Sequence, residues 1–317
     1  MLMYLCIWIG LFVLAFALTA PGLMSLTFPL FPLPVAIYWA RGRALYSLGL
    51  VACAGLACGF GAWALGDFAL AAAVAGLGVL MGVAAVRRWR FGWCVAVTAG
   101  AAYVLAVAVT LTRWASVRQN IDIFVNGVIA QLQEEGSGQD AGSIEGMTEA
   151  LRVFGKHFEY LGLGMLFGTV LLSVTVAVVL LARCLRRSGT AAQLRGSFRT
   201  MQTPDWVVWL AIATALLWFV DNRWPNHAVR MIAWNSASGL TTVYWLNGLS
   251  IVVYAMGTFP LSPIACYAII LALFWFQASP ALCVVGLFDT WWDFRQRFAL
   301  AAEARRLRKE MNDNDNP

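Results

Sequence analysis

Residues 160–182 read YLGLGMLFGTVLLSVTVAVVLLA and contain no charged side chain. About 20 apolar residues are enough for one α-helix to cross the hydrocarbon core of a bilayer. Basic residues follow this run, opposed by a single acidic residue, Asp205: they are Arg183, Arg186, Arg187, Arg195 and Arg199. An apolar run that ends in clustered arginines is typical of a transmembrane helix whose basic end lies in the cytoplasm.

The composition of the whole chain agrees with this first segment. Of the 317 residues, 61% are hydrophobic and only 12% are charged, whereas soluble domains carry about 25% charged residues. So much apolar surface requires a lipid bilayer as its partner. The formal net charge of +6 comes from arginines at the ends of apolar segments, a pattern that sets membrane orientation, and nucleic-acid binding is therefore not expected.

We therefore predict an all-α fold: a polytopic transmembrane helical bundle of about eight to ten membrane segments, with both termini cytoplasmic. Residues 2–19 lack a basic leader and are interpreted as a retained first helix. The number of passes over 206–294 stays open, since the apolar runs near its end are short. The predicted parts are N-terminal membrane helices (1–112), an extracytoplasmic amphipathic loop (113–157), C-terminal membrane helices (158–294) and a cytoplasmic basic tail (295–317).

Small residues and prolines indicate how these helices pack. Glycine pairs spaced four apart let helix backbones approach closely; they are Gly55/Gly59, Gly78/Gly82 and Gly164/Gly168. Three prolines fall within 29–34, and a regular helix is not expected there. The 28–34 segment, with Pro32 and Pro34, is either a broken segment that shapes the mouth of a cavity or an interfacial loop.

One polar group inside a predicted span is a candidate ligand-binding residue. Asn247 lies in the apolar segment 240–256, beside Tyr244 and Trp245. The amide offers a donor and an acceptor, the two rings offer flat faces, and polar residues inside a membrane are often functional. The alternative is that Asn247 only hydrogen-bonds a neighbouring helix.

The end of the last apolar run brings charge and aromatic rings together. Residues 286–297 read GLFDTWWDFRQR. Asp289 and Asp293 are four residues apart and share a helix face, so we expect an arginine such as Arg295 to neutralise them. This segment is interpreted either as a membrane-exit anchor or as a docking point for a cytoplasmic partner. The following residues, 298–311, predict a basic amphipathic helix suited to an anionic membrane surface or a partner helix.

No metal site, cofactor or catalytic residue is predicted. The seven cysteines form no CxxC pair, and neither HxxxH nor HExxH occurs. Both histidines, His157 and His227, lie at the predicted ends of helices, whereas a serine–histidine intramembrane hydrolase usually needs a histidine inside a span. We therefore expect that the protein is not an enzyme.

The pattern as a whole resembles the DUF2232 family of bacterial membrane proteins. The resemblance rests on the proline segment from Pro32 to Arg43, the long amphipathic loop, the Phe198 to Pro204 approach to a span, and the ending from Gly286 to Arg295. It implies a multi-pass protein of the bacterial inner (cytoplasmic) membrane. The family is distantly similar to the substrate-binding S components of energy-coupling-factor transporters.

Two functions follow as expectations. The first is a small-molecule binding or transport subunit resembling an S component, with Asn247, Tyr244, Trp245, Pro32 and Pro34 against the ligand. The alternative is a non-catalytic membrane scaffold that docks cytoplasmic proteins through its arginine-rich loop and tail, with contributions from Asp289, Asp293 and Arg295.

Overall fold

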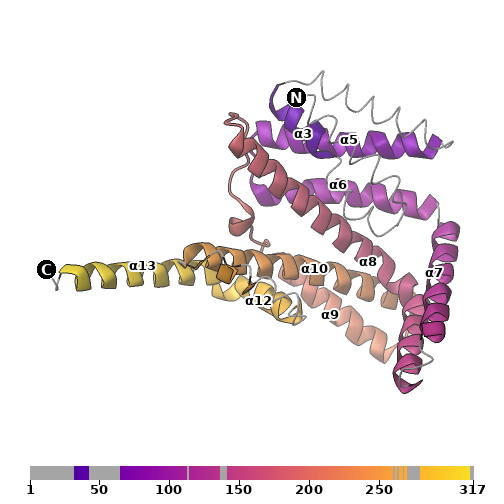
Figure 1. The fold of residues 1–317 in the computed structure, drawn as a ribbon. Helices are drawn as coiled ribbons and strands as arrows, with labels where there is room; N and C mark the ends of the chain where they lie inside the picture. Colours follow the sequence, from indigo (N-terminus) through magenta and orange to yellow (C-terminus); the bar gives the residue numbers. More distant parts are fainter. Residues whose placement is uncertain are drawn as a thin grey trace. The chain divides into compact units, whose positions relative to one another are not determined.

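The computed structural model describes residues 32–42, 65–112, 114–135, 141–259, 261–262, 264–266, 268–269 and 279–314. Regular structure in these residues is helical, without a β-strand, and confirms the predicted all-α fold of a helical membrane bundle. In chain order the elements of Figure 1 are α3 (Pro32–Ala40), α5 (Leu65–Val86), α6 (Phe91–Thr112), α7 (Trp114–Glu135), α8 (Ala141–Arg187), the short 3₁₀ helix η3 (Phe198–Thr200), α9 (Val207–Arg223), α10 (His227–Thr258), α12 (Ser279–Trp292) and α13 (Phe294–Asn314).

Three helical stretches in the described part of the chain are long and apolar enough to cross a membrane. They are Phe91–Thr112, Tyr160–Arg187 and His227–Thr258. The middle stretch contains the uncharged apolar run 160–182 and forms the C-terminal part of α8. The predicted first helix (2–19) and the Gly55/Gly59 pair lie outside the described residues, so the predicted number of passes stays a prediction.

Two helices are longer than the sequence pattern predicted. The C-terminal part of the predicted amphipathic loop (113–157) and the apolar run 160–182 form one 47-residue helix, α8. Residues 227–239 and the predicted apolar segment 240–256 likewise belong to one 32-residue helix, α10. Neither sequence contains a proline, so the backbone hydrogen-bond ladder continues although the polarity of the side chains changes.

Prolines instead lie at helix ends. Pro32 and Pro34 stand in the first turn of α3, and Pro280 is the second residue of α12, positions at which a missing N–H breaks no helical hydrogen bond. Helix α10 ends at Thr258, two residues before Pro260. The described part of the predicted broken segment, from Pro32 onward, is therefore the start of a helix.

Contacts divide the chain into two compact units that interleave along the sequence. The first comprises residues 1–102, 169–208 and 241–317, and the second comprises 103–168 and 209–240. Helices α6, α8 and α10 each contribute to both units. The units are groups of contacting residues, whereas the four predicted parts are consecutive stretches of sequence, and the predicted boundaries stay a prediction.

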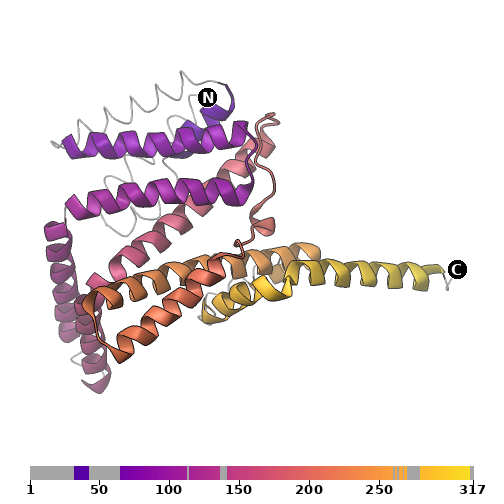
Figure 2. The ribbon, with the colours of Figure 1, turned by 180° about the vertical axis from the view of Figure 1, so that it is seen from behind.

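Glycines allow the close packing of helices inside the first unit. A Cβ atom on Gly78 would lie 2.6 Å from the carbonyl oxygen of Pro32, and one on Gly82 would lie 2.8 Å from the Cβ of Trp39. Helix α3 therefore lies directly on α5 through the predicted Gly78/Gly82 pair (Figures 1 and 2).

The second unit contains a similar close contact and an ion pair whose arginine is partly exposed. The amide of Gly164 in α8 donates a hydrogen bond of 2.7 Å to the side-chain oxygen of Asn235 in α10. At the turn between α9 and α10, Arg230 Nε donates to Asp221 Oδ2 at 3.0 Å. This hydrogen bond lowers the pKa of Asp221 below its ordinary value. The backbone amide of Asn226 adds a second hydrogen bond to the same carboxylate.

Candidate functional site

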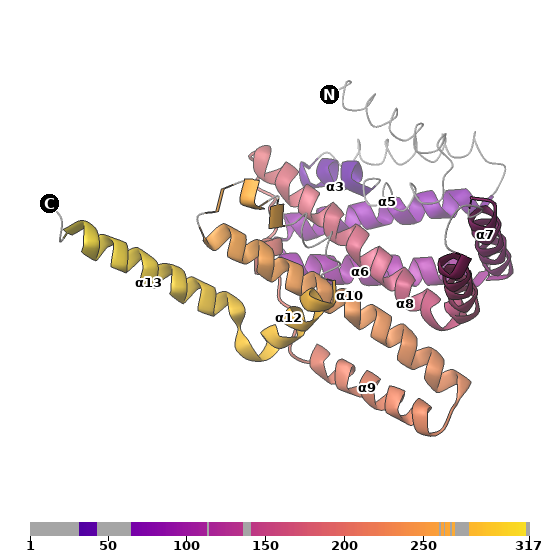
Figure 3. The ribbon, with the colours of Figure 1, turned by 60° about the horizontal axis from the view of Figure 1, so that its bottom comes forward.

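The site is built where the backbones of α10 and α12 touch, inside the first unit (Figure 3). A Cβ atom on Gly248 would collide with the carbonyl oxygen of Leu282, and a Cβ atom on Gly286 would collide with that of Tyr244. Only glycine fits at both positions, because each faces the backbone of the other helix. The polar residues next to these glycines are therefore held close to the opposite helix.

Asn247, the residue before Gly248, uses this contact to cross between the helices. Its Nδ2 donates to the carbonyl oxygen of Gly286 at 2.8 Å and lies 3.5 Å from Asp289 Oδ2. Its Oδ1 accepts a hydrogen bond of 3.2 Å from Arg295. Both ends of the amide thus have protein partners, as expected of a side chain that is only 2% exposed.

Arg295 is the centre of the group. Its Nη1 forms the ion pair with Asp289, and its Nη2 donates to the carbonyl oxygen of Met201 at 2.6 Å and to Ser250 Oγ. Its Nε donates to the carbonyl oxygen of Arg199 at 3.3 Å. We call this group the Arg295 cluster; it consists of Asn247, Ser250, Asp289 and Arg295 with the carbonyl groups of Arg199 and Met201.

Burial makes these hydrogen bonds necessary. The side chains of Arg295 and Asp289 are only 7% and 6% exposed. Taking a charge out of water costs several kcal/mol unless an opposite charge and hydrogen bonds compensate it. The planar guanidinium carries five N–H donors in a fixed fork, so a single side chain can serve a carboxylate, an amide, a hydroxyl and two carbonyl groups at once.

A sharp break between α12 and α13 brings Arg295 back onto Asp289. Asp293, between the two helices, has a φ of 41°, in the left-handed region that few residues other than glycine adopt. Asp289 Oδ1 accepts a hydrogen bond from the backbone amide of Phe294 at 3.0 Å and so caps the first turn of α13. Asp289 therefore fixes both the break and the charge that follows it.

The structure unites two groups of residues that the sequence analysis kept apart. Asn247, predicted to contact a ligand, lies with Asp289 and Arg295, predicted to form an ion-pair or docking cluster. Asp293 is exposed and lies outside the cluster, where its carboxylate accepts a hydrogen bond from Gln296 N at 3.4 Å. Asp289 and Asp293 therefore do not share an arginine, because the helix on which they would share a face ends between them.

Comparison with known proteins places the chain in a family. The family model described as "Predicted membrane protein (DUF2232)" matches residues 7–290. The chain belongs to the DUF2232 family. The match includes Asn247 and Asp289 and stops before Arg295. Searches of the curated proteins and of the solved structures found no match.

The other residues predicted to contact a ligand in this DUF2232 chain do not belong to the Arg295 cluster. Tyr244 is buried, and its hydroxyl has no hydrogen-bond partner within the described ranges. Trp245 is half-buried. Pro34 follows Pro32 in the first turn of α3, and Pro32 borders a different feature, a small cleft between α3, α5, α6 and α8.

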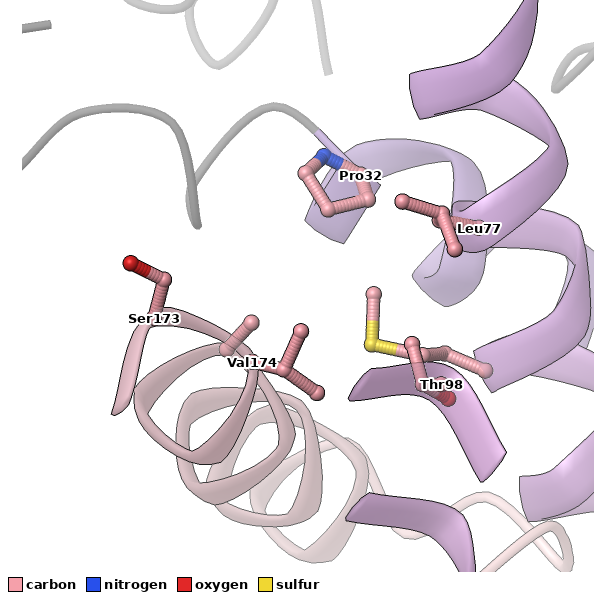
Figure 4. A pocket seen from close by; sticks show the side chains of 7 residues that line it. Pro32, Leu77, Thr98, Ser173 and Val174 are labelled. Atoms are coloured by element: carbon pink, nitrogen blue, oxygen red, sulfur yellow. The ribbon is translucent and has the colours of Figure 1, made fainter. Parts of the chain in front are cut away.

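That cleft is shown in Figure 4. The space that it encloses is about 10 Å³, room for about one water molecule. Typical ligand sites enclose about 300–1,000 Å³ and present a few convergent polar groups. This cleft is smaller and its lining is apolar; the residues around it are Pro32, Leu77, Met81, Thr98, Ser173, Val174 and Ala177.

Sequence reasoning missed the part of the cluster contributed by the chain between α8 and α9. Residues 188–206, the α8–α9 connection, contain only the short helix η3. Long-range hydrogen bonds fix this connection at several points. Arg195 exchanges backbone hydrogen bonds of 2.9 Å with Trp89 and Phe91, and Arg88 donates to the carbonyl oxygen of Ala191 at 3.3 Å. The hydrogen bonds from Arg295 to the carbonyl groups of Arg199 and Met201 hold the end of this connection. No sequence motif marks these carbonyl groups.

The fixed connection belongs to a basic surface of the first unit. Exposed arginines lie on it, at the end of α8, and in the turn between α5 and α6: Arg87, Arg88, Arg90, Arg183, Arg186, Arg187, Arg195 and Arg199. We call these residues the basic surface. Buried hydrogen bonds hold the backbone while the guanidinium groups remain exposed, so the positions of the charges are set by the fold.

Proposed function

We propose that this membrane protein is a non-catalytic scaffold that docks an acidic protein on its cytoplasmic side through the basic surface. The observation that carries this proposal is the pair of hydrogen bonds from buried Arg295 to the carbonyl groups of Arg199 and Met201. They attach an irregular segment that bears exposed arginines to the packed helices α10, α12 and α13. Binding residues are commonly presented on loops that a rigid scaffold positions.

The state of Asn247 supports the scaffold over a ligand site at that residue. An amide that recognises a ligand needs a free donor or acceptor, and both groups of Asn247 are used within the Arg295 cluster. The cytoplasmic placement follows from the arginine clusters at the ends of apolar segments. Exposed arginines suit bidentate contacts with the carboxylates of a protein partner.

Site-specific photo-crosslinking in native cells tests the docking role. A photoreactive residue at Arg187 or Arg195 should give one discrete protein adduct. The matched control is Arg152, an exposed arginine whose loop is predicted on the opposite side of the membrane. Changing Arg183, Arg186 and Arg187 together to Gln should abolish the adduct at Arg195, while the same three changes to Lys should preserve it. Absence of any adduct, or an equal one at position 152, refutes the docking role.

A small-molecule binding subunit resembling an S component is the second candidate. The observation in its favour is the Tyr244 hydroxyl, which is buried without a partner in the described residues, since a ligand group could satisfy such an atom. Native mass spectrometry of the purified protein distinguishes the two candidates. A bound small molecule that is retained by wild type and lost from a Tyr244→Phe variant would favour the second candidate over the first.

A further inference from the structure

Helix α13 presents two faces of different character. One face packs against the end of α10: the ring of Phe298 lies 5.9 Å from that of Phe259, and Arg305 lies 5.0 Å above the Phe259 ring. The stacked pair Phe294 and Phe298 continues this face towards Arg295. The start of α13 is therefore held by aromatic contacts as well as by the Arg295 cluster, while the rest of the helix continues to the C-terminus (Figures 1 and 3).

The opposite face of α13 carries an exposed apolar row. Leu300, Leu307 and Met311 are 59%, 55% and 61% exposed, and Ala304 lies exposed between the two leucines. The steps of four, three and four residues keep these side chains on one side of the helix. They also match the alternating a and d positions of a coiled coil, with the two leucines at d. We call these four residues the apolar row.

The charges beside the apolar row are complementary to those of a second copy of the same helix. With the leucines at d, Glu303 occupies position g and Arg308 occupies position e of the next heptad. In a parallel two-stranded coiled coil, a g residue pairs with the e residue five positions later on the other helix. Glu303 therefore meets Arg308 of the partner subunit, and two-fold symmetry repeats the pair.

We propose that α13 pairs with α13 of a second copy of this chain as a parallel, in-register coiled coil through Leu300, Ala304, Leu307 and Met311. Copies that share one membrane and one orientation present their C-terminal helices in parallel, as this register requires. The row spans only about 17 Å of helix at 1.5 Å per residue, so two free helices would pair weakly. Attachment to the same bilayer raises their effective concentration.

An anionic lipid surface is the competing occupant, because a lipid-binding helix usually carries basic residues on its polar face and α13 also exposes Arg305 and Arg306. The residues at the two edges of the apolar row favour the pair of helices over lipid. Here Glu303 flanks one edge of the apolar row and Arg308 the other, and both are exposed. The glutamate would lie against negative headgroups, whereas opposite charges on opposite edges satisfy each other in a symmetric pair. This pairing does not depend on the proposed docking role. It is tested by the dimer fraction alone, which does not involve a docked partner.

Charge reversal of the full-length protein in lipid nanodiscs tests the pairing. The dimer fraction is measured by native mass spectrometry. Glu303→Arg and Arg308→Glu, made singly, place like charges opposite each other, and each should weaken the dimer about tenfold. The double variant Glu303→Arg/Arg308→Glu restores opposite charges and should restore the dimer. Residues 303 and 308 are both exposed, so thermal unfolding of the three variants should match that of wild type and serves as the folding control.

Cysteine crosslinking in membranes checks the register. Leu307→Cys should form an interchain disulfide on mild oxidation, because d positions of parallel helices face each other. Ala299→Cys, at an exposed position off the apolar row, is the matched control and should crosslink no faster than wild type with its native cysteines. A monomeric wild type, a dimer unaffected by the single charge reversals, or equal crosslinking at 299 and 307 overturns the proposal. A tail whose only measurable binding is to vesicles containing anionic lipid also overturns it.

Discussion

Two arginine–aspartate pairs join helices within the described residues, and their surroundings differ. Arg295 and Asp289 are 7% and 6% exposed, and the arginine also binds an amide, a hydroxyl and two backbone carbonyl groups. Arg230 and Asp221, nine residues apart, link the end of α9 to the start of α10; the aspartate is only 8% exposed, but the arginine is 39% exposed. The members of the first pair are six residues apart, but its arginine also binds carbonyl groups almost 100 residues earlier in the chain. The second pair closes a local turn.

The difference shows that the contribution of an ion pair to stability depends on its burial and on the other groups that its arginine binds. Solvent reaches the partly exposed Arg230 and can hydrate it when its partner is lost, so the second pair should contribute less to stability than the first. A buried pair leaves an uncompensated charge when one partner is removed, and here it would also release two carbonyl groups of the α8–α9 connection. Substitutions at the two sites should therefore differ in magnitude, in salt dependence and in effects at a distance.

Removal of one partner of the buried pair should have the largest effect. Arg295→Met leaves Asp289 charged and buried, and should lower the free energy of unfolding by about 3–5 kcal/mol. Arg295→Lys should recover only part of this loss, because an ammonium group cannot reach all the acceptors of the guanidinium. Denaturant titration in detergent micelles measures the free energy of unfolding.

The double variant Asp289→Leu/Arg295→Met is the control for that prediction. It removes both charges, and should be more stable than either single variant because no buried charge is left alone. If the double variant loses as much as the sum of the two single losses, the two side chains act independently and the buried pair does not explain their effect.

The contact between α10 and α12 can be disturbed without changing a charge. Gly286→Ala places a methyl group against the carbonyl oxygen of Tyr244, and should cost about 1–3 kcal/mol by forcing the helices apart. Gly100→Ala is the matched control: a Cβ atom there meets nothing within 4 Å, so it should be neutral or stabilise the helix by up to about 1 kcal/mol. Equal losses at both positions would contradict the close approach of α10 and α12.

The sequence predicted the helical class and several packing features for physical reasons that act locally. Apolar runs without proline form helices in lipid, since every backbone group must be satisfied internally. The spacing of Gly78 and Gly82 predicted close packing, and the structure shows which helix they face. The continuity of α8 and α10 was missed because a change in side-chain polarity does not interrupt backbone hydrogen bonds.

The candidate site was only partly predictable. Asn247, Asp289 and Arg295 were identified because polar groups near apolar runs are conspicuous. Their meeting depends on the Gly248–Gly286 contact across 38 residues and on a left-handed Asp293, and no spacing rule encodes either feature. The carbonyl groups of Arg199 and Met201 belong to the backbone, so their role leaves no signature in residue type.

The break at Asp293 offers a smaller test of how Arg295 reaches Asp289. Asp293→Ala should destabilise the protein by about 1 kcal/mol, because alanine tolerates a positive φ poorly and provides no acceptor for Gln296 N. Asp293→Gly should be more stable than the alanine variant, since glycine adopts this conformation without strain. Thermal unfolding of the two variants compares them directly, and the opposite order would show that the backbone conformation of residue 293 is not the cause.

The Asp221–Arg230 pair, whose arginine is partly exposed, should show the smallest effect and a characteristic pH dependence. Asp221→Asn keeps an oxygen acceptor for Arg230 but loses the charge, so at neutral pH it should lower the melting temperature only slightly. The hydrogen bond from Arg230 lowers the pKa of Asp221 in the folded state, and the carboxylate therefore stabilises the fold fully above its unfolded pKa of about 4. That contribution is lost as the pH falls through the lower folded pKa.

The difference in melting temperature between wild type and Asp221→Asn should thus be constant near neutral pH and should become smaller below about pH 4. A difference in melting temperature that stays constant down to about pH 2 would show that the charge of Asp221 is not its cause. A loss of stability as large as that of Arg295→Met would contradict the distinction between the two pairs.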